Sequence, residues 1–196
     1  LIELFNYLSG FSKQKTYQKL LVSPTSLRKK FIFLINREIE NAKRGEKGEI
    51  IAKMNSLVDP EIIQLLYLAS QTGVKIHLII RGICCLYPQR KNLSENIKVT
   101  SIIGNFLEHS RIFWFHNNNN SEVFIGSADW MRRNLDRRIE AVTPIEDIKL
   151  KSQLYNLLQI YIDDNYYSWV MNKDGVYEKK KEDSNLNRSQ IDLIKN

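Results

Sequence analysis

Cysteine is scarce in this chain: the only two, Cys84 and Cys85, are neighbours in the sequence. Two adjacent thiols cannot build a disulfide framework, and no further cysteine remains to complete a metal site. We therefore expect both thiols to be buried and reduced, as in a cytoplasmic protein. Long apolar runs are also missing, because no stretch approaches the ~20 residues that span a bilayer. The sequence thus predicts no transmembrane segment, and it leaves peripheral contact with an inner membrane open.

The usual features of an N-terminus are missing as well. The chain begins Leu1-Ile2-Glu3-Leu4, without an initiator methionine and without the charged start of a signal peptide. We expect the sequence to be a fragment that begins partway through a longer protein.

Charge of one sign is in excess. Lysine and arginine number 29 against 22 aspartates and glutamates, which gives a formal net charge of +7. Such an excess favours polyanionic partners: nucleic acid, phosphate polymers or an anionic membrane surface. It specifies no partner by itself, because a basic surface can simply be solvated. With 196 residues, of which 43% are hydrophobic, the chain is long enough for one complete core.

The composition divides the chain into three parts. Residues 1–19 contain a short amphipathic helix and then a polar, lysine-rich linker. Residues 20–172 alternate apolar strands with amphipathic helices, which is typical of an α/β domain. From Lys173 the sequence turns polar and poor in apolar residues, so we expect residues 173–196 to be a disordered tail.

Hydrophobic periodicity predicts a mixed sheet in the central part. The predicted strands cover residues 20–22, 50–54, 74–80, 99–103, 112–115, 123–125 and 138–142. The predicted helices cover residues 27–44, 60–72 and 147–165. The strand, helix and strand between residues 50 and 80 form a right-handed unit with parallel strands. The polar run Asn117–Asn120 predicts a turn between two antiparallel strands.

Four predicted strand ends carry chemically active side chains. Arg81 follows one strand, His109 and Ser110 precede another, Ser127 closes a third, and Glu140 lies at a fourth. An α/β fold can bring such ends together at one edge of the sheet, where ligands bind. Cationic, titratable and hydroxyl groups gathered there suit a phosphate ester or anhydride. The sequence therefore predicts chemistry on phosphoryl groups.

Arg81 is the first candidate for a phosphate contact. It ends an apolar run, so its guanidinium must reach solvent or pair with an anion. Its planar fork matches two phosphate oxygens, although a carboxylate of the protein would serve as well. Lys53 and Asn55 share one face of their strand just before a helix N-terminus, which is a favourable anion site. Asn55 or Asp59 could equally act only as a helix cap.

His109 is the main catalytic candidate. Arg111 lies two residues along, on the same face of the strand, and Gly126-Ser127 ends a later strand. The arrangement resembles one half of the phospholipase D-like motif, in which His-x-Lys is followed by an aspartate and then by Gly-Ser. Arg111 replaces the lysine, and Phe115 and His116 occupy the region where the acid would fall.

Glu140 and the tryptophans have alternative interpretations. Glu140 follows Arg137 and Arg138 and could simply pair with them. Trp114 and Trp130 are expected in the core rather than as platforms for stacking bases.

Longer segments carry a more specific resemblance. Five of them, in unbroken order, resemble the C-terminal portion of polyphosphate kinase, the bacterial class that works through a phosphohistidine. They are AKMNSLVD at 52–59, RGICCL at 81–86, LSENI at 93–97, FLEHSR at 106–111 and GSADWMRRNLDRRIE at 126–140. The similarity runs from near residue 1 to about residue 170, which makes it far more specific than any single motif.

The resemblance implies an α/β fold for residues 20–172, namely a phospholipase D-like mixed β-sheet flanked by helices. Residues 1–19 would then be the tail end of a preceding domain, and in that family two such domains face each other across an ATP-binding tunnel. It also implies that Arg81 and His109 contact ATP phosphates, that His109 assists as a general acid or base, and that Glu140 is an active-site residue. Lys53, Asn55 and Ser127 complete the predicted phosphate-binding set.

Other parts of the family's site are expected outside this chain. The phosphorylated histidine, the arginines linked to Mg²⁺ and the nucleotide-base contacts would lie before Leu1, and no metal ligand is assigned here. The implied reaction is ATP + polyP(n) = ADP + polyP(n+1), with Mg²⁺ accompanying ATP. The implied partners are ATP or ADP, inorganic polyphosphate, the upstream domains, and further copies in a homo-oligomer, but not nucleic acid. The chain alone is expected to show little or no kinase turnover.

Two other functions stay open at this point. One is a phospholipase D-like phosphodiesterase or nuclease that builds its site from two copies of a half-motif, for which His109-x-Arg111 is a poor match. The other is a non-catalytic module that binds polyanions through its basic surface, with salt-sensitive affinity.

Overall fold

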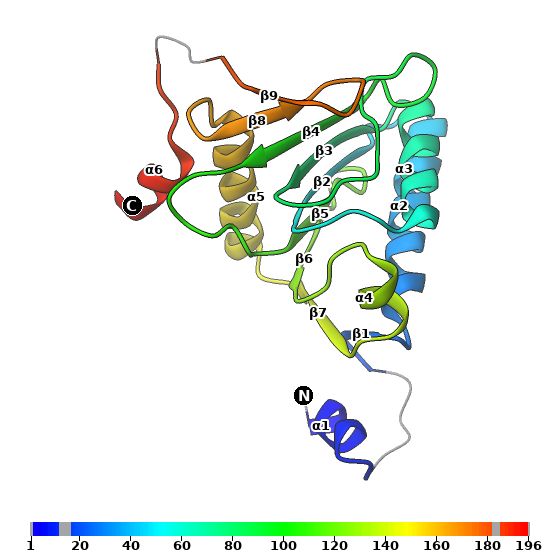
Figure 1. The fold of residues 1–196 in the computed structure, drawn as a ribbon. Coiled ribbons are helices and arrows are strands. Elements are labelled where there is room, and N and C mark those ends of the chain that lie inside the picture. The colour runs from blue at the N-terminus through cyan, green and yellow to red at the C-terminus, as the bar shows by residue number, and fades with distance from the viewer. Residues whose placement is uncertain (1, 12–16, 182–184, 196) are drawn as a thin grey trace.

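The computed structural model describes residues 2–11, 17–181 and 185–195. Their core is a nine-stranded mixed sheet with the strand order β1-β7-β6-β5-β2-β3-β4-β8-β9 (Figure 1). The strands are β1 (Leu21–Ser23), β2 (Glu49–Met54), β3 (Lys75–Ile80), β4 (Ile97–Ile102), β5 (Ile112–Phe115), β6 (Glu122–Gly126), β7 (Glu140–Ile145), β8 (Ser168–Met171) and β9 (Tyr177–Lys179). The helices are α1 (Ile2–Leu8), α2 (Leu27–Lys43), α3 (Pro60–Gln71), α4 (Arg132–Asp136), α5 (Ile148–Asp163) and α6 (Ser189–Lys195).

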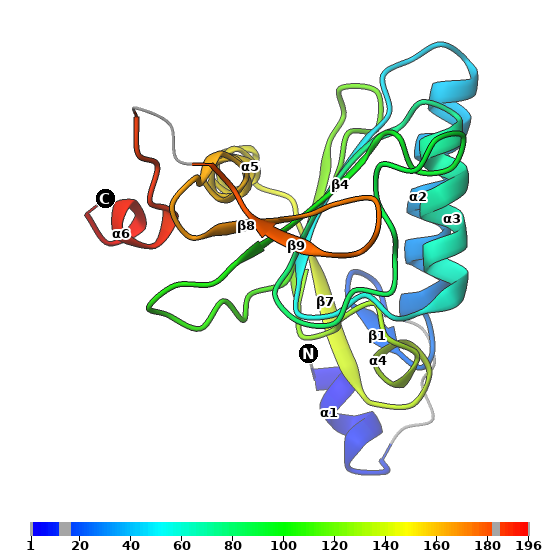
Figure 2. The ribbon, with the colours of Figure 1, turned by 45° about the horizontal axis from the view of Figure 1, so that its top comes forward.

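Helices cover both faces of the sheet, which confirms the expected fold class. Figure 2 shows α2 and α3 on one side of the strands and α5 on the other. Alternation along β2 produces this division: Ile50, Ala52 and Met54 belong to the core shared with α2 and α3, whereas Ile51 packs with Leu158 of α5. Two hydrophobic cores therefore stabilise the sheet, one on each face.

The parallel part of the sheet is built by the predicted strand–helix–strand unit. Strands β2 and β3 pair in parallel, and β4 continues in the same direction beside β3. Between β2 and β3, helix α3 begins at Pro60. Asp59 caps its N-terminus, because the Asp59 side chain accepts a hydrogen bond from the Ile62 amide at 3.1 Å. The carboxyl ends of β2 and β3 thus meet at one edge of the sheet.

Antiparallel pairing brings further strand ends to that same edge. Strand β5 runs antiparallel to β2, β6 antiparallel to β5, and β7 antiparallel to β6. The turn between β5 and β6 contains the predicted polar run, in which Asn117, Asn118 and Asn119 all have positive φ, a conformation that asparagine tolerates better than most residues. The starts of β5 and β7 and the end of β6 consequently lie beside the ends of β2 and β3.

The expectation of a disordered tail from Lys173 is wrong for the described residues of that segment. Strand β9 pairs with β8, and α6 packs beside α5. The composition is indeed poor in apolar residues, but polar contacts fix the segment: Lys180 Nζ donates to the carbonyls of Ile162 and Asp164 at 3.0 and 2.9 Å. Residues 182–184 and 196 fall outside the described residues.

Two smaller expectations need correction. The strand predicted from residue 138 begins at Glu140, because Arg138 lies in the turn after α4. Cys84 is half-buried, and burial raises the pKa of its thiol to about 11, whereas Cys85 is exposed, so only one thiol fits the expected buried state. Among the helices of the described ranges, none has the length and apolar character needed to cross a bilayer.

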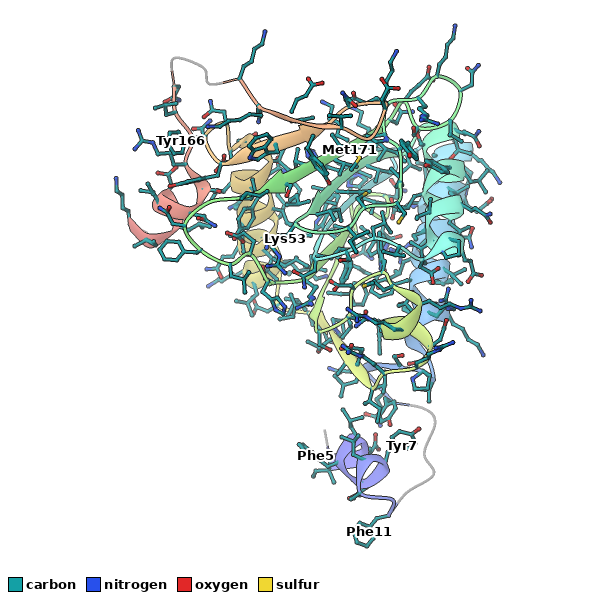
Figure 3. All side chains as sticks on the ribbon, in the orientation of Figure 1. Phe5, Tyr7, Phe11, Lys53, Tyr166 and Met171 are labelled. Atoms are coloured by element: carbon teal, nitrogen blue, oxygen red, sulfur yellow. The ribbon has the colours of Figure 1, made fainter. Side chains whose placement is uncertain are left out.

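Helix α1 stands apart from the sheet at the N-terminal end (Figures 1 and 3). The predicted short amphipathic helix is confirmed, and its apolar side chains are largely uncovered: Phe5 is 66% exposed and Ile2 78%. Residues 12–16 of the expected linker lie outside the described residues.

Candidate functional site

Every residue predicted for the site lies at the sheet edge where the five strand ends meet. The residues are Lys53 in β2, Asn55 just after it, Arg81 after β3, His109 before β5, Ser127 after β6 and Glu140 at the start of β7. The strands concerned are neighbours in the order β7-β6-β5-β2-β3. Chain segments that are up to 87 positions apart in sequence are thereby brought together, as the strand pattern predicted.

Arg81 contacts an amide rather than a carboxylate. Its Nε donates to Asn55 Oδ1 at 3.0 Å, and no ion pair found among the described residues involves its guanidinium. The alternative of a structural arginine–carboxylate pair is therefore not what this structure contains. A half-buried guanidinium that forms no ion pair within the described ranges is suited to binding an external anion.

A line of hydrogen bonds connects Arg81 with His109. Beyond Asn55, the backbone amide of Asn55 donates to Asp129 Oδ1 at 2.8 Å. Asp129 in turn binds Arg111, with Nε–Oδ1 at 3.0 Å, and Arg111 Nη1 lies 2.9 Å from His109 Nδ1. Arg81 and His109 thus occupy the two ends of one network, without a direct contact between them in the described structure.

Arg111 fixes the tautomer of the His109 ring. A guanidinium only donates, so the Nδ1 atom that it contacts must be the acceptor. The neutral ring then carries its proton on Nε2. The imidazole is exposed, which leaves Nε2 accessible to a ligand. The neutral His109 ring can therefore present an N–H donor at this edge.

Lys53 is the most deeply buried charged group of the set. Its side chain is 2% exposed, and Figure 3 shows it beside α5. Its Nζ donates to Ser110 Oγ at 2.7 Å, lies 3.0 Å from Glu108 Oε2, and sits 4.7 Å from the ring centre of Tyr161. Burial lowers the pKa of Lys53, and the nearby Glu108 carboxylate opposes that shift. The Lys53 ammonium is therefore enclosed by protein groups, and it contacts the side chains of Glu108 and Ser110, the two residues that flank His109.

Glu140 joins the ends of β6 and β7. Ser127 Oγ and Asn134 Nδ2 both donate to its carboxylate, one to each oxygen. The predicted alternative, pairing with Arg137 or Arg138, is absent from the ion pairs of the described residues, and both arginines are exposed. A buried carboxylate whose two oxygens are satisfied by neutral donors is held in one orientation.

Gly126 makes this close approach of the two strands possible. A Cβ atom at this position would lie 2.4 Å from the Ala141 carbonyl oxygen and 2.7 Å from Val142 Cα, both of which belong to β7. Any larger residue would push β6 away from β7, and with it Ser127 from Glu140.

The structure adds Glu108, Asp129 and Asn134, which sequence reasoning did not assign to the site, and it gives Ser110, which was noted only as a hydroxyl at a strand end, a contact with Lys53. All four lie inside the segments that carried the family resemblance. Asp129 was missed because the acid was sought near His116, at the spacing of the phospholipase D-like motif. It lies instead two residues after Gly126-Ser127. His116 follows β5, and its amide donates to the Glu49 carbonyl at the start of β2, which is the end of that strand away from the site. Its ring is buried, and burial lowers its pKa.

In the ranges that the structure describes, no group of three or more His, Cys, Asp or Glu residues is placed to hold a metal ion. The donors at the sheet edge are instead a guanidinium, an imidazole and hydroxyl and amide groups, which suit an anion.

Comparison with known proteins identifies relatives along almost the whole chain. A family model described as polyphosphate kinase C-terminal domain 2 matches residues 20–190, a range that extends beyond residue 172 and includes β9 and the start of α6. A polyphosphate kinase of Prochlorococcus marinus (strain MIT 9313) is 60% identical over 99% of this chain, and one of Pseudomonas aeruginosa is 46% identical over 94%.

Solved structures agree with these relatives. The crystal structure of a polyphosphate kinase from Porphyromonas gingivalis matches with a TM-score of 0.95 and 41% identity, over 99% of this chain and 30% of that one. NucT from Helicobacter pylori matches over 74% of this chain and 94% of its own with a TM-score of 0.53 and 16% identity, a likeness of fold alone. The chain spans 28% of the length of the Prochlorococcus relative. The family match over most of its residues and the identity along its length show that this chain belongs to the polyphosphate kinase family, of which it represents the second C-terminal domain.

Proposed function

We propose that this chain is the C-terminal catalytic part of an enzyme that reversibly transfers the terminal phosphate of ATP to inorganic polyphosphate, ATP + polyP(n) = ADP + polyP(n+1). The transfer passes through a phosphohistidine that belongs to a part of the enzyme outside this chain. The observation that carries the proposal is the uncompensated Arg81 guanidinium, linked through Asn55, Asp129 and Arg111 to the exposed His109 ring.

The chemistry needs cationic and hydrogen-bond donors around the migrating group. When the accepting histidine attacks, a nitrogen–phosphorus bond forms, the bond from the terminal phosphorus to the bridging oxygen breaks, and ADP leaves with the electron pair. Negative charge spreads over the transferred oxygens in this transition state. Arg81 binds two of these oxygens, and the neutral His109 ring donates a hydrogen bond from its Nε2–H to a transferred oxygen in both directions of the reaction, without giving up the proton.

The remaining predicted residues take supporting roles in this proposal. Glu140 holds Ser127 and Asn134, and we assign it a role in proton transfer as a carboxylate of this edge that is paired with neutral donors rather than with a cation. Lys53 supplies positive charge from below, and Asn55 orients Arg81. Mg²⁺ accompanies ATP, but the described residues offer no cluster to hold it, so we assign its ligands to other parts of the enzyme.

The proposed partners follow from the family. They are ATP or ADP, polyphosphate, the upstream domains of the same polypeptide, and further copies in a homo-oligomer. We place the enzyme in the cytoplasm, where ATP is abundant.

The experiment compares Arg81→Ala and His109→Ala with the unmodified full-length protein. Each variant should lower the rate of polyphosphate synthesis by about 10²–10³-fold, because each removes a preorganised contact to the transition state. Arg44→Ala is the matched control, since Arg44 directly follows α2 at the opposite edge of the sheet and is exposed. Near-normal synthesis by both site variants would overturn the proposal.

The same proteins separate the two rival functions. Cleavage of plasmid DNA or of a generic phosphodiester would favour the phosphodiesterase. The structure argues against this function, because Asp129 already binds the Arg111 guanidinium, which stands where that motif has its lysine. Salt-sensitive polyphosphate binding that is indifferent to Arg81→Ala, without synthesis, would favour the polyanion-binding module.

A further inference from the structure

The C-terminal helix α6 lies against the loop that carries His109. This loop, residues 103–111 between β4 and β5, extends toward α6 in Figures 1 and 2. The contact is unexpected from the sequence, which predicted a disordered tail. It connects a segment near the end of the chain with the centre of the candidate site.

Gln190 of α6 makes three hydrogen bonds to the loop. Its Oε1 accepts from the Phe106 amide at 3.0 Å, and its Nε2 donates to the Phe106 carbonyl at 2.8 Å. The same Nε2 donates to Glu108 Oε1 at 2.8 Å. The residue is 4% exposed, so water cannot readily replace these bonds. Gln190 therefore binds the backbone N–H and C=O of one loop residue, Phe106, and also the Glu108 carboxylate two residues further along.

From Glu108 the contacts continue to both sides of His109. Glu108 Oε2 lies 3.0 Å from Lys53 Nζ, and Lys53 also donates to Ser110 Oγ at 2.7 Å. The residues immediately before and after His109 are thus tied to the same buried ammonium. Because Gln190 fixes Glu108 from the other side, the position of the histidine depends on α6.

Helix α6 is itself anchored by buried polar groups. Asp164, which is 0% exposed, accepts from the Ser189 amide at 2.7 Å and from Ser189 Oγ at 2.5 Å. Asn165 Oδ1 accepts from the Asn187 amide at 2.8 Å. The residue before Gln190 is therefore held at the end of α5, which is part of the folded core.

Gly104 leaves the room that the Gln190 side chain occupies. A Cβ atom at position 104 would lie 2.4 Å from Gln190 Oε1 and 2.6 Å from Tyr167 Cδ1. Replacing Gly104 by alanine would therefore push the Gln190 amide away from the loop while position 190 remains a glutamine.

We propose that Gln190 is a positioning residue for phosphoryl transfer: it holds the 103–111 loop so that His109 faces the transferred phosphate, and α6 is thereby part of the catalytic machinery. This inference rests on the proposed function and deepens it. Gln190 acts through Glu108 and the Phe106 backbone, and it does not touch the substrate.

Gln190→Met in the full-length protein tests the proposal, because methionine keeps the length of the side chain and loses all three hydrogen bonds. Amide hydrogen exchange of peptides covering residues 103–111 should rise by about tenfold or more, most of all at the Phe106 amide. The kcat for polyphosphate synthesis should fall by about tenfold or more while the KM for ATP changes less than about twofold, because His109 is misplaced in the transition state and Arg81 is untouched. Gln64→Met, at an exposed position of α3, is the matched control.

Two further variants keep the result interpretable. Gly104→Ala should reproduce the increase in exchange and the fall in kcat with Gln190 intact. Gln190→Glu keeps the acceptor for the Phe106 amide but sets a second carboxylate against Glu108, so it should retain protection at Phe106 and still lose kcat.

Unchanged exchange in the loop, or an unchanged kcat despite faster exchange, for both Gln190→Met and Gly104→Ala would overturn the inference. Absence of synthesis by the unmodified protein would overturn the proposed function instead, and loop exchange would still decide whether Gln190 holds the loop.

Discussion

Arg111 and Asp129 form a two-point ion pair, with Nε–Oδ1 at 3.0 Å and Nη2–Oδ2 at 3.3 Å. Arg111 Nη1 stays outside this pair and contacts the ring and the carbonyl oxygen of His109 at 2.9 and 2.8 Å. The Arg111–Asp129 pair therefore orients the His109 ring. Lys53 in turn holds Glu108 and Ser110, the residues on either side of His109.

Asp129→Ala should lower the free energy of unfolding by about 3–5 kcal/mol, because it leaves a largely buried guanidinium unpaired and also removes the acceptor of the Asn55 amide. Urea unfolding of the purified protein measures this change. Asp163→Ala, at an exposed position near the end of α5, should stay within about 0.5 kcal/mol. If both substitutions changed the free energy of unfolding by the same small amount, the Arg111–Asp129 pair would not stabilise the fold as proposed.

Glu140→Gln separates a structural from a chemical role of this carboxylate. The amide keeps the shape and one acceptor oxygen, and Ser127 can turn its hydroxyl, so we expect a loss of stability of only about 1–2 kcal/mol. If the carboxylate moves a proton, synthesis should nevertheless fall by about 10²-fold or more. Steady-state rates measured beside urea unfolding decide between the two, and a rate loss no larger than about twofold would remove Glu140 from the chemistry.

Lys53 and Glu108 should be energetically coupled. Lys53→Met leaves a mostly buried carboxylate without its partner, and Glu108→Gln removes the charge that opposes the lowered pKa of Lys53. The double-mutant cycle should therefore give a coupling free energy of about 1–3 kcal/mol in urea unfolding. The exposed pair Lys43 and Glu40 is the control, and we expect its coupling to be much weaker because solvent screens both charges. Additive effects at Lys53 and Glu108 would show that their contact is not a stabilising pair.

His77 should make the fold sensitive to acid. Burial, with smaller contributions from Lys98 and Lys180, lowers the pKa of the His77 ring to about 4. Between its ordinary pKa near 6.5 and about 4, the unfolded ring takes up a proton that the folded ring does not, so stability falls as the pH is lowered through this range. By pH 5 the loss should reach about 2 kcal/mol relative to pH 7.5.

Urea unfolding at pH 7.5 and pH 5.0 tests this expectation with His77→Gln as the comparison. The substitution removes the titrating ring, so its stability should change less between the two values. A drop of the same size in the variant would assign the acid sensitivity to other groups.

The sequence was sufficient for the centre of the fold and insufficient for its C-terminal part. The β-branched run before Arg81 and the Asp59-Pro60 helix start are local signals, and both elements form where expected. Strands β8 and β9 are short, and α6 depends on Asp164, a buried carboxylate distant along the chain. No local pattern reveals a helix whose stability comes from a partner 25 positions away.

The sequence predicted the location of the site more completely than it predicted the contacts between the site residues. Strand ends located Arg81 and His109 at one edge, because strand direction alone decides that. Their connection through Asp129 depends on which side chain reaches which, and the motif spacing pointed to the region of His116 instead. Lys53 was expected at a phosphate, and only the packing of α5 reveals that its ammonium is enclosed by Glu108, Ser110 and Tyr161.

The pairing of Lys53 with Ile112 across β2 and β5 limits how such a protein can change in length. Since successive side chains in a strand point to opposite faces, deleting one residue within β2 would turn the lysine into the core beside α2 and bring an aliphatic residue beneath His109. The Asn117–Asn120 turn lies beyond the ladder, where an added residue inverts nothing. Insertions and deletions that survive selection should accordingly accumulate in that turn. In the five strands that begin or end at the site, each residue should stay on the face of the sheet that it occupies here.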